Sequence, residues 1–534
     1  MKLGKSKIRN YLKAILIAIA CCQFPILASA QSQPSIESND ASIMVRQIEV
    51  RGHTIFSDEE IAAIVEAYRG KRLDYAELRN ITQEIADLYV TKGYITSGAF
   101  LPEQEIVDGV VEVQIIEGKL ERIDISGVKN LQENYVRSFI SSAKTSPQPT
   151  LNVKTLEDEL KLLRQDDSIK NIKAELVRGT QPHLSVLLLE VEEVNSWETG
   201  LSFDNYRSPS IGELQGTVAM GYRNLIGIGD RFSAQYNLTE GFDAYSLAYI
   251  LPFNSQGGGL SLEYRDGDSK IVENFEDAGI RAEYDTFSVQ YRQPLVYQPE
   301  REIAVGIGFA KKNSETFILD DEPYSFITGS AQNRSETSVL KLTGDWLERT
   351  QSAVFAFNSE INIGLDVFDA TFNENSPDGI FFSWLSQAQW TQALNRERDL
   401  LLVTRLITQL TPDSLLPLEQ FTLGGAGTVR GYRQNQEIGD NAVVGTIELY
   451  IPLISDRFNE NTLNLVPFFD GGTVWNNSND EAEALASLGI GLNWQFKDWL
   501  SVRVDWGLPL INRSDRGDSL QDDGFTFFLQ LQPF

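Results

Sequence analysis

The residues best suited to a specific polar contact lie in the most glycine-rich loop of the chain, "LGGAGTVRGYRQ", Leu423 to Gln434. Arg430 lies within this loop. A buried guanidinium needs an anionic partner, because burying its charge alone is very costly, and a two-pronged bond to a carboxylate fixes both position and angle. The leading partner is Asp470, in "VPFFDGGTVW". The alternative is a solvent-exposed arginine on an outer loop and an aspartate at a strand end.

Few other residues could carry catalysis. The sequence contains 2 histidines, His53 and His183, and neither has a cysteine, a histidine or paired carboxylates at metal-ligand spacing. Its 2 cysteines, Cys21 and Cys22, lie in an N-terminal segment that is expected to be removed. Carboxylates are numerous, but spacing singles out no acid–base pair, and no GxxxxGK[ST] nucleotide loop is present. These observations predict a protein that is not an enzyme and that holds no metal and no cofactor.

The first 30 residues have the form of a secretory signal peptide. Five lysines and arginines precede an apolar run that closes on Ala28-Ser29-Ala30, so cleavage is expected after Ala30. Lipid attachment at Cys21 is the alternative, but the apolar run continues beyond it to a better cleavage site. Removing five positive charges takes the formal net charge from −29 to −34, which repels nucleic acid phosphates and argues against a nucleic acid partner.

An internal repeat precedes the main part of the chain. The pattern Ile-x-[Val/Ile]-x-Gly occurs at Ile48–Gly52 and again at Ile123–Gly127, a spacing of about 75 residues. In each repeat a strand is followed by two helices with apolar residues at helical spacing and then by two short strands. We therefore expect two α+β domains of order β-α-α-β-β, at 44–118 and 119–193, whose free sheet edges can accept an extended peptide.

Residues 197–534 consist of strands in which an apolar or aromatic row alternates with a polar or small row. In one run the apolar row is Leu500, Val502, Val504 and Trp506, and the opposite row is Ser501, Arg503 and Asp505. A sheet with lipid on one side and water on the other needs this pattern. No mature segment has about 18 uncharged apolar residues in a row, so a helical membrane span is excluded. About sixteen runs of this kind predict a 16-stranded antiparallel transmembrane β-barrel rather than a soluble sandwich.

The connections support the same interpretation. Short breaks occur at Asn395–Arg398 and Lys497-Asp498, whereas long polar loops are expected at Asp266–Gly279 and Ile318–Arg334. Short turns on one side and long loops on the other are typical of outer-membrane barrels. The chain ends within an aromatic run, "FTFFLQLQPF", as expected if the last strand pairs with the first.

The glycine-rich loop, near 423–436, falls between the eleventh and twelfth expected strands. Sixteen strands enclose a lumen wide enough to hold water, so an unobstructed pore would leak. Several glycines let a loop fold sharply and press close to a wall. If this loop folds into the lumen, Arg430 and Asp470 are its expected anchor, whereas the solvent-exposed alternative stays open on these residues alone.

At these residues the chain resembles the two-partner secretion transporters, the TpsB family of ShlB/FhaC/HecB-type haemolysin secretion/activation proteins. The signature of their long sixth loop is matched by Val429, Arg430, Gly431 and Tyr432, and the strand motif that receives its arginine is matched by Phe468, Asp470 and Gly472. Arg433 falls outside the signature, so the resemblance implies that Arg430 and Asp470 set the position of the loop, with Tyr432 packing beside them. The stretch "GYITSGAFLPEQEIVDGVVEVQIIEGKLE" resembles the end of the first POTRA domain of such transporters. The resemblance covers about residues 44–534.

The resemblance implies a monomeric barrel in outer-membrane lipid of a Gram-negative-type bacterium, with POTRA 1 at 44–118 and POTRA 2 at 119–193 in the periplasm. Its partner would be a large secreted β-helical exoprotein of the adhesin or cytolysin type, recognised unfolded by the POTRA domains and exported without ATP. Family members often place a plug helix before the first POTRA domain. The segment 31–43 is too short and too polar for a helix and a linker, so the loop is expected to carry more of the seal.

The sequence leaves three alternative functions. An insertase of the same superfamily would fold other barrels into the membrane, but it usually carries more POTRA domains. A passive solute porin has no use for two such domains. An enzyme in the lumen would need a pair of catalytic residues that spacing does not reveal.

Overall fold

The computed structural model describes residues 42–140, 150–273, 275–327, 332–374, 377–456, 460–478, 481–513 and 517–533. The predicted signal peptide (1–30), nearly all of the polar segment 31–43 and the terminal Phe534 lie outside these residues. The described chain forms two compact units, and the division between them passes through the second repeat. One unit contains residues 42–122, 150–155 and 176–187, and the other contains 123–140, 156–175 and the described residues from 188 onward.

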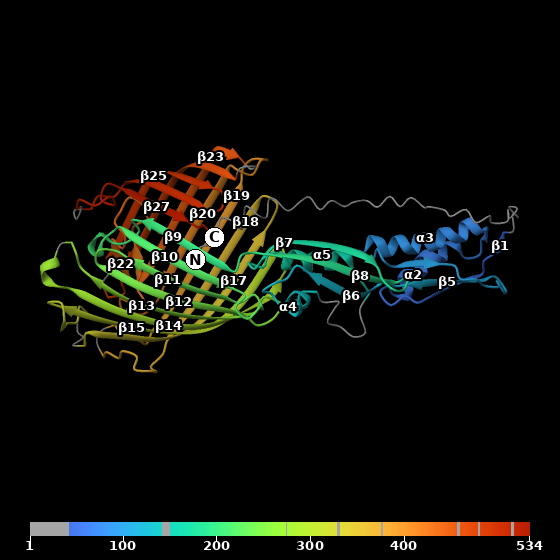
Figure 1. Cartoon of the computed structure of the whole chain (residues 1–534), viewed down its shortest axis with the longest axis horizontal. Helices are drawn as coiled ribbons and strands as arrows, with labels where there is room; N and C mark the ends of the chain where they lie inside the picture. The colour runs from blue at the N-terminus through green and yellow to red at the C-terminus, as the bar shows by residue number, and fades with distance from the viewer. Residues whose placement is uncertain are drawn as a thin grey trace. The chain divides into compact units, whose positions relative to one another are not determined.

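The first repeat has the predicted order β-α-α-β-β. Its elements are β2 (Gln47–Arg51), α2 (Asp58–Val65), α3 (Tyr75–Thr91), β4 (Gly98–Phe100) and β5 (Val110–Ile116), with the short pieces β1 (Ile43–Met44), η1 (Glu66–Tyr68) and β3 (Arg72–Leu73) between or before them. The sheet order is β2-β5-β4, with β2 parallel and β4 antiparallel to β5. Figure 1 shows α2 and α3 lying together beside this sheet.

Both helices of the first repeat begin at capped residues and bury one apolar stripe. Ser57 and Asp74 each accept a hydrogen bond from the backbone three residues on, while the glutamate there bonds back to the cap. The stripe of α3 is Leu78, Ile81, Ile85 and Tyr89, all buried against β5 and α2. This stripe forms much of the core between the helices and the sheet.

The second repeat has the same order of elements and of strands. Its elements are β6 (Lys119–Ser126), α4 (Glu133–Ser138), α5 (Val153–Leu163), β7 (Ile169–Arg178) and β8 (Leu184–Glu193). The sheet order β6-β8-β7 places the last strand in the centre, as β5 is in the first repeat. The helix expected near 133–142 ends at Ser138, and residues 141–149 lie outside the described part.

Each repeat ends in a glutamate that binds the loop after its first strand. Glu117 follows β5 and accepts from the backbone N–H of Thr54 (2.7 Å) and Ile55 (3.0 Å). Glu193 ends β8 and accepts from the backbone N–H groups of Lys129 (2.6 Å) and Leu131 (3.0 Å). The repeat therefore conserves a carboxylate-to-loop contact in addition to its hydrophobic pattern.

Glu117 is the more buried of these contacts. It also accepts from the hydroxyls of Tyr89 (2.8 Å) and Thr150 (2.9 Å), and the residue is 8% exposed. Burial alone would raise the pKa of Glu117, but hydrogen bonds from Thr54, Tyr89 and Thr150 outweigh it and lower the pKa below its usual value. Its ionised form therefore stabilises the first unit.

Replacing Glu117 by glutamine is expected to destabilise the first unit by about 2–4 kcal/mol. The amide NH₂ would then face the N–H and O–H groups that donate to the carboxylate. Since the pKa is lowered on folding, the stabilisation is present above the unfolded value of about 4.3 and is lost as the pH falls through the folded pKa. Hydrogen exchange of α3 amides in the full-length protein should lose this pH dependence in the variant. Glu84→Gln, at an exposed site, is the control, and equal effects of both changes would contradict the assignment.

A closed antiparallel barrel follows the second repeat, as predicted. Its sixteen long strands, counted over the described residues, are β9 (Trp197–Asp204), β10 (Gln215–Arg223), β11 (Arg231–Leu238), β12 (Phe242–Pro252), β13 (Gly259–Lys270), β14 (Arg281–Tyr297), β15 (Arg301–Ile318), β17 (Arg334–Arg349), β18 (Ala353–Gly364), β19 (Phe382–Ala393), β20 (Leu401–Leu410), β23 (Asn441–Asp456), β24 (Asn461–Trp475), β25 (Ala482–Phe496), β26 (Leu500–Pro509) and β27 (Phe525–Leu531). The two-residue β16 (Glu322–Pro323) extends the edge of β15. The last strand, β27, pairs with β9 and closes the ring.

The alternation of side chains follows the prediction. On β26, Val504 and Trp506 are 41% and 42% exposed on the outer face, whereas Asp505 between them is 2% exposed. The outward apolar row suits lipid and the inward row is polar or small. Among the described residues no helix combines the length and the apolar run that a membrane crossing would require.

The ends of the barrel differ in the length of their connections. The turn between β10 and β11 packs on α4, where the Gln132 backbone N–H donates to Gly227 O (2.8 Å). Connections at this end are short, such as those between β14 and β15 and between β25 and β26. The long connections, such as those before β17, β19 and β23, lie at the opposite end. The loop expected from Asp266 begins only at residue 271, because β13 continues as a paired strand to Lys270.

Candidate functional site

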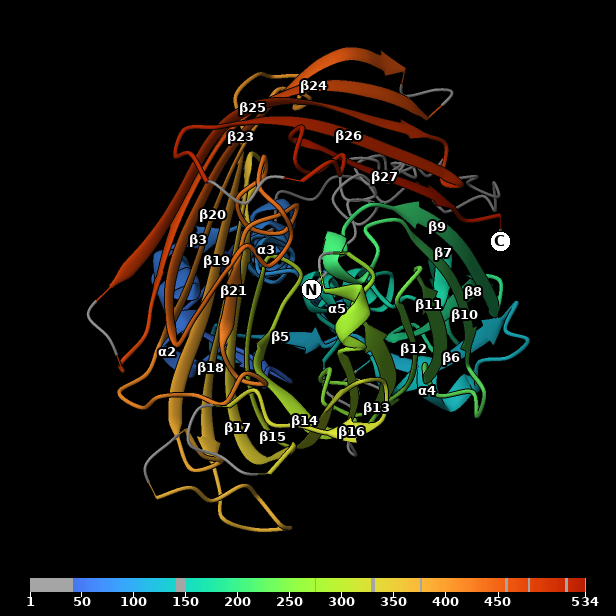
Figure 2. The same ribbon diagram turned by 90° about the vertical axis from the view of Figure 1, so that its left-hand side faces the viewer.

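The glycine-rich loop forms a hairpin between the eleventh and twelfth barrel strands, β20 and β23. Two short strands, β21 (Phe421–Leu423) and β22 (Glu437–Gly439), pair antiparallel at its base. Figure 2 shows β21 inside the ring of strands. Gly424 and Gly425 turn the chain with φ of 110° and 89°, a region that side chains rarely adopt. This sharp turn lets the hairpin lie against the inner wall, where Leu423 packs on residues of β23, β24 and β25.

Arg430 binds Asp470 of β24 through two parallel hydrogen bonds. Arg430 Nε donates to Asp470 Oδ2 (2.7 Å) and Nη2 donates to Oδ1 (2.8 Å). The Arg430 backbone N–H also donates to Oδ2 (3.2 Å). Arg430 is 4% exposed and Asp470 is 0% exposed, so the pair is removed from bulk water. The structure thus brings together the two residues that the sequence analysis paired, in the bidentate geometry that fixes position and angle.

Three further charged residues complete the cluster. Arg430 Nη1 donates to Glu448 Oε1 of β23 (2.7 Å) and lies 3.6 Å from Asp505 Oδ1 of β26. Arg503 of β26 donates to both of these carboxylates, each at 2.6 Å. The three carboxylates and Arg430 are buried, Arg503 beside them is 19% exposed, and each arginine offsets the repulsion among the acids. The Arg430 guanidinium also stacks 3.5 Å from the centre of the Phe468 ring.

Strand β25 makes room for this cluster by carrying glycine on its inner face. A Cβ at Gly489 would stand 2.1 Å from the Phe468 ring, and a Cβ at Gly491 would stand 2.0 Å from Asp505 Oδ1. Because β25 lies between β24 and β26, any side chain there would push the Arg430 partners apart. The absence of side chains at these two glycines therefore leaves the space that Phe468 and Asp505 occupy beside Arg430.

The remaining predicted site residues hold the hairpin by packing. Val429 and Tyr432 belong to an apolar cluster whose other buried members are Leu423, Ala442, Val444, Val474 and Leu485. The Tyr432 hydroxyl lies within hydrogen-bond distance of the carbonyl oxygens of Ala486 (2.8 Å) and Ile511 (2.9 Å) and can donate its one proton to either, so it contacts the wall rather than the Arg430–Asp470 pair. Gly472 faces this cluster, and a Cβ there would stand 2.8 Å from Leu423 Cδ1.

Gly431 marks the closest approach between the hairpin and the wall. It has a φ of 90°, and a Cβ would stand 2.8 Å from the Gly507 carbonyl oxygen on β26. A Cβ at Gly507 would in turn stand 2.7 Å from the Gly431 nitrogen. Two backbones meet here without side chains between them, which places Arg430 within reach of both β24 and β26.

Sequence reasoning missed Glu448, Arg503 and Asp505 as parts of this site. Arg503 and Asp505 were placed on the water-facing row of a strand, but nothing in their spacing linked them to Arg430. Glu448 lies in "IELYIPL", where a single acid on an otherwise apolar strand was the available signal. Within the described residues no group of three His, Cys, Asp or Glu side chains is arranged to hold a metal ion.

Comparisons with known proteins show the family to which the chain belongs. The profile described as haemolysin secretion/activation protein ShlB/FhaC/HecB matches residues 183–494, and a POTRA domain of ShlB type matches residues 43–118. The chain is 22% identical over 487 residues to the outer membrane transporter CdiB of Dickeya dadantii, covering 87% of this chain and 82% of that protein. It is 21% identical over 519 residues to the hemolysin transporter protein ShlB of Serratia marcescens, covering 93% and 87%.

Solved structures share the fold. CdiB from Escherichia coli superposes with a TM-score of 0.72 at 20% identity, covering 94% of this chain and 93% of that chain. BamA from Haemophilus ducreyi lacking POTRA domains 1–3 gives a TM-score of 0.55 at 16% identity, covering 92% and 100%. At these identities the likeness concerns the fold alone.

A closed barrel with an anchored inner hairpin, preceded by POTRA-type domains, defines an outer-membrane transporter whose POTRA domains lie in the periplasm. The chain belongs to the haemolysin secretion/activation family ShlB/FhaC/HecB. Members of this family act in protein secretion with secreted exoproteins as partners, and they are transporters rather than enzymes. The resemblance, fold class and location expected from the sequence are thereby confirmed.

Proposed function

We propose that this transporter exports an unfolded partner through the barrel lumen without ATP. The observation that carries the proposal is the bidentate Arg430–Asp470 pair, which holds a hairpin against the inner wall where a passing chain would meet it. Val429, Gly431, Tyr432 and Gly472 position the hairpin for this contact. A buried ion cluster gives one defined position, from which the hairpin can be displaced as a unit.

The two POTRA domains, at 44–118 and 119–193, would receive the partner. Both sheets end in outer strands, β2 and β4 in one and β6 and β7 in the other. An extended segment can add to such an edge through backbone hydrogen bonds without a specific side-chain sequence. This mode suits the amino-terminal segment of a large β-helical exoprotein of the adhesin or cytolysin type, presented before it folds.

The energy for export would come from the partner itself. The periplasm offers no ATP, and the chain lacks a GxxxxGK[ST] loop. A partner that folds outside the cell cannot return through the lumen, so its folding free energy draws the chain outward. The barrel would do this as a monomer, since its ring closes on itself through β27 and β9.

An insertase of the same superfamily is the second candidate, and the barrel seam favours it. Strands β27 and β9 pair only from Asp204–Phe528 to Leu201–Leu531, a shorter ladder than the one between β26 and β27. Beyond this ladder the Asn205 side chain bonds to the β27 backbone in place of a strand partner. Its Nδ2 donates to Phe525 O (3.0 Å) and its Oδ1 accepts from the Phe527 N–H (2.7 Å). A short seam is where new strands could add.

Deleting this transporter from the cells that make it should distinguish the two. Export of a partner predicts the loss of one or a few large β-rich proteins from the culture medium, by at least about tenfold, because spontaneous passage across the membrane is negligible. The amounts of other outer-membrane barrels, measured by quantitative mass spectrometry, should stay unchanged. A general fall in those barrels with the medium unaltered would refute export and support insertion. Re-expression of the intact chain is the control.

A further inference from the structure

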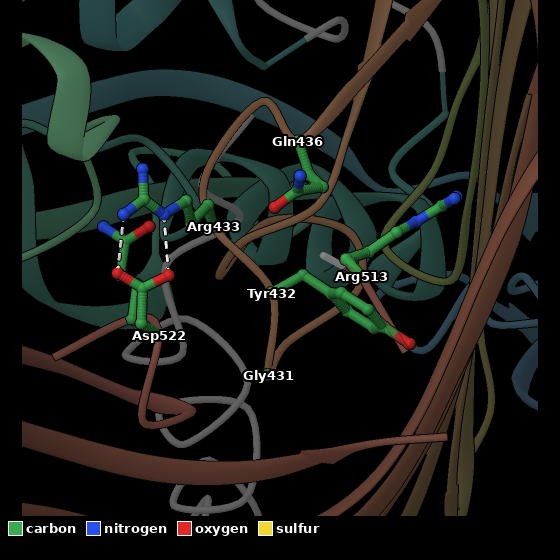
Figure 3. A pocket seen from close by; sticks show the side chains of 7 residues that line it. Gly431, Tyr432, Arg433, Gln436, Arg513 and Asp522 are labelled. Carbon is green, nitrogen blue, oxygen red and sulfur yellow. Dashed lines mark hydrogen bonds and ion pairs between the residues drawn. The ribbon is translucent and has the colours of Figure 1, made fainter. Parts of the chain in front are cut away.

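A second arginine of the hairpin makes contacts that the signature motif does not explain. Arg433 lies three residues after Arg430, and its side chain is 15% exposed. Figure 3 shows that the side chains of Arg433 and Tyr432 leave the hairpin on opposite sides, Tyr432 away from Asp522 and Arg433 toward it. The two arginines therefore hold different parts of the molecule.

Arg433 binds two carboxylates from two different loops. Its Nε and Nη2 donate to the two oxygens of Asp522, each at 2.7 Å, and its Nη1 and Nη2 donate to the two oxygens of Glu273 at 2.8 and 2.9 Å. Asp522 lies between β26 and β27, and Glu273 lies between β13 and β14. One planar guanidinium thus spans three connections of the barrel.

Neighbouring backbone contacts extend this link to a fourth connection. The Gln434 backbone N–H donates to Gln521 Oε1 (2.6 Å). Gln521 Nε2 donates to the carbonyls of Asn205 and Arg207, both at 2.6 Å, between β9 and β10. A Cβ at Gly517 would stand 2.2 Å from Arg433 Nη2, so the loop before β27 wraps closely around the guanidinium.

All four connections lie at the same end of the barrel. They follow the first, fifth, eleventh and fifteenth strands, and consecutive strands run in opposite directions. The β10–β11 turn, which packs on α4, follows the second strand and lies at the other end. Since the POTRA domains are periplasmic, the connections joined by Arg433 lie at the cell-surface end.

We propose that Arg433 is a second positioning residue of the transporter and latches the hairpin to the surface loops, closing the outer mouth separately from the Arg430 cluster. The role of this latch in the cell rests on the proposed export function, whereas the contacts of Arg433 do not depend on it. The Arg430 and Asp470 side chains of the inner cluster are 5% and 0% exposed, whereas Arg433 and Glu273 of the outer pair are 15% and 27% exposed. Partly solvated ion pairs are weaker and are screened by salt, so the outer latch opens more easily than the inner cluster.

Purified full-length protein in planar lipid bilayers tests the latch without any partner. Arg433→Gln should raise the frequency of channel openings at rest by about fivefold or more, the effect of losing one partly exposed paired charge. Salt should raise the opening frequency of the unaltered protein beyond the rise in bulk conductivity, and this extra dependence should vanish in the variant. A merely structural role for Arg433 would not remove the salt dependence.

Arg301→Gln is the matched control, because Arg301 also makes a two-pronged pair, with Glu348, at the other end of the barrel. It should open no more often than the unaltered protein. If Arg433→Gln fails to assemble, Asp522→Asn removes the same pair from the loop side and should give the same phenotype. Equal opening frequencies of the Arg433 and Asp522 variants and the unaltered protein, or an equal rise in Arg301→Gln, would overturn the proposal. If Arg433→Gln lost export but opened no more often than the unaltered protein, the latch would be contradicted while the proposed export function would stand.

Discussion

Replacing Arg430 by alanine is expected to cut export of the partner by at least about tenfold while the barrel still assembles. The change leaves Asp470, Glu448 and Asp505 with one arginine among them in a buried site. Removing one partner of a buried pair costs about 3–5 kcal/mol, which is enough to release the hairpin from its docked position. The measurement is the amount of partner in the medium relative to the amount of folded barrel in the outer membrane.

Assembly of the barrel should survive because the cluster is not part of the strand ladder. Strands β23 to β26 are paired along their lengths by backbone hydrogen bonds, and Arg430 touches only their inner face. Resistance of the folded band to denaturation on unheated gels would report assembly. Full export by Arg430→Ala would show that the docked hairpin is dispensable.

Exchanging the two charges tests the pairing itself. Arg430→Asp and Asp470→Arg should each abolish export, whereas the double variant should recover part of it, because interaction energies appear only between residues that touch. The recovery would be incomplete, since Glu448 and Asp505 would then face an aspartate on the hairpin. A double variant no better than the worse single variant would argue against a direct pair.

Substituting Gly431 by valine is expected to impair export as strongly as losing Arg430. The residue has a φ of 90° and meets the Gly507 carbonyl, so a β-branched side chain faces both backbone strain and a clash with an atom that cannot move aside. The hairpin would have to withdraw from β26, and Arg430 would lose its reach to Asp505. Export and resting conductance of the same preparations are the two measurements.

The same hairpin supplies the control for this change. Gly427 has no positive φ, and a Cβ there would meet no atom within 4 Å. Gly427→Ala should therefore leave export and conductance unchanged. If both substitutions act alike, flexibility of the hairpin rather than close approach at Gly431 would explain the result.

The architecture was predictable because it depends on local periodicity. Alternation of apolar and polar residues, such as Val504 and Asp505 on β26, specifies which side of a strand faces lipid, and the repeat spacing specifies two similar domains. The start of the loop before β14 was misplaced because the polar end of β13 stays paired with β14 up to Lys270, where no apolar row marks the strand. A pattern of apolar and polar residues within one strand does not show how far that strand stays paired with its neighbour.

For the candidate site, too, the sequence indicated some residues and the tertiary structure added others. The sequence by itself determined the barrel and the two repeats before it, because both follow from periodicity within short stretches, whereas the arginine-to-aspartate pair was favoured only through the resemblance of a short motif. Only the tertiary structure decided that Glu448, Arg503 and Asp505 share the Arg430 site and that Arg433 joins Glu273 to Asp522. Those residues come from strands and loops far apart in the chain, and barrel closure and stagger decide which of their inward side chains meet.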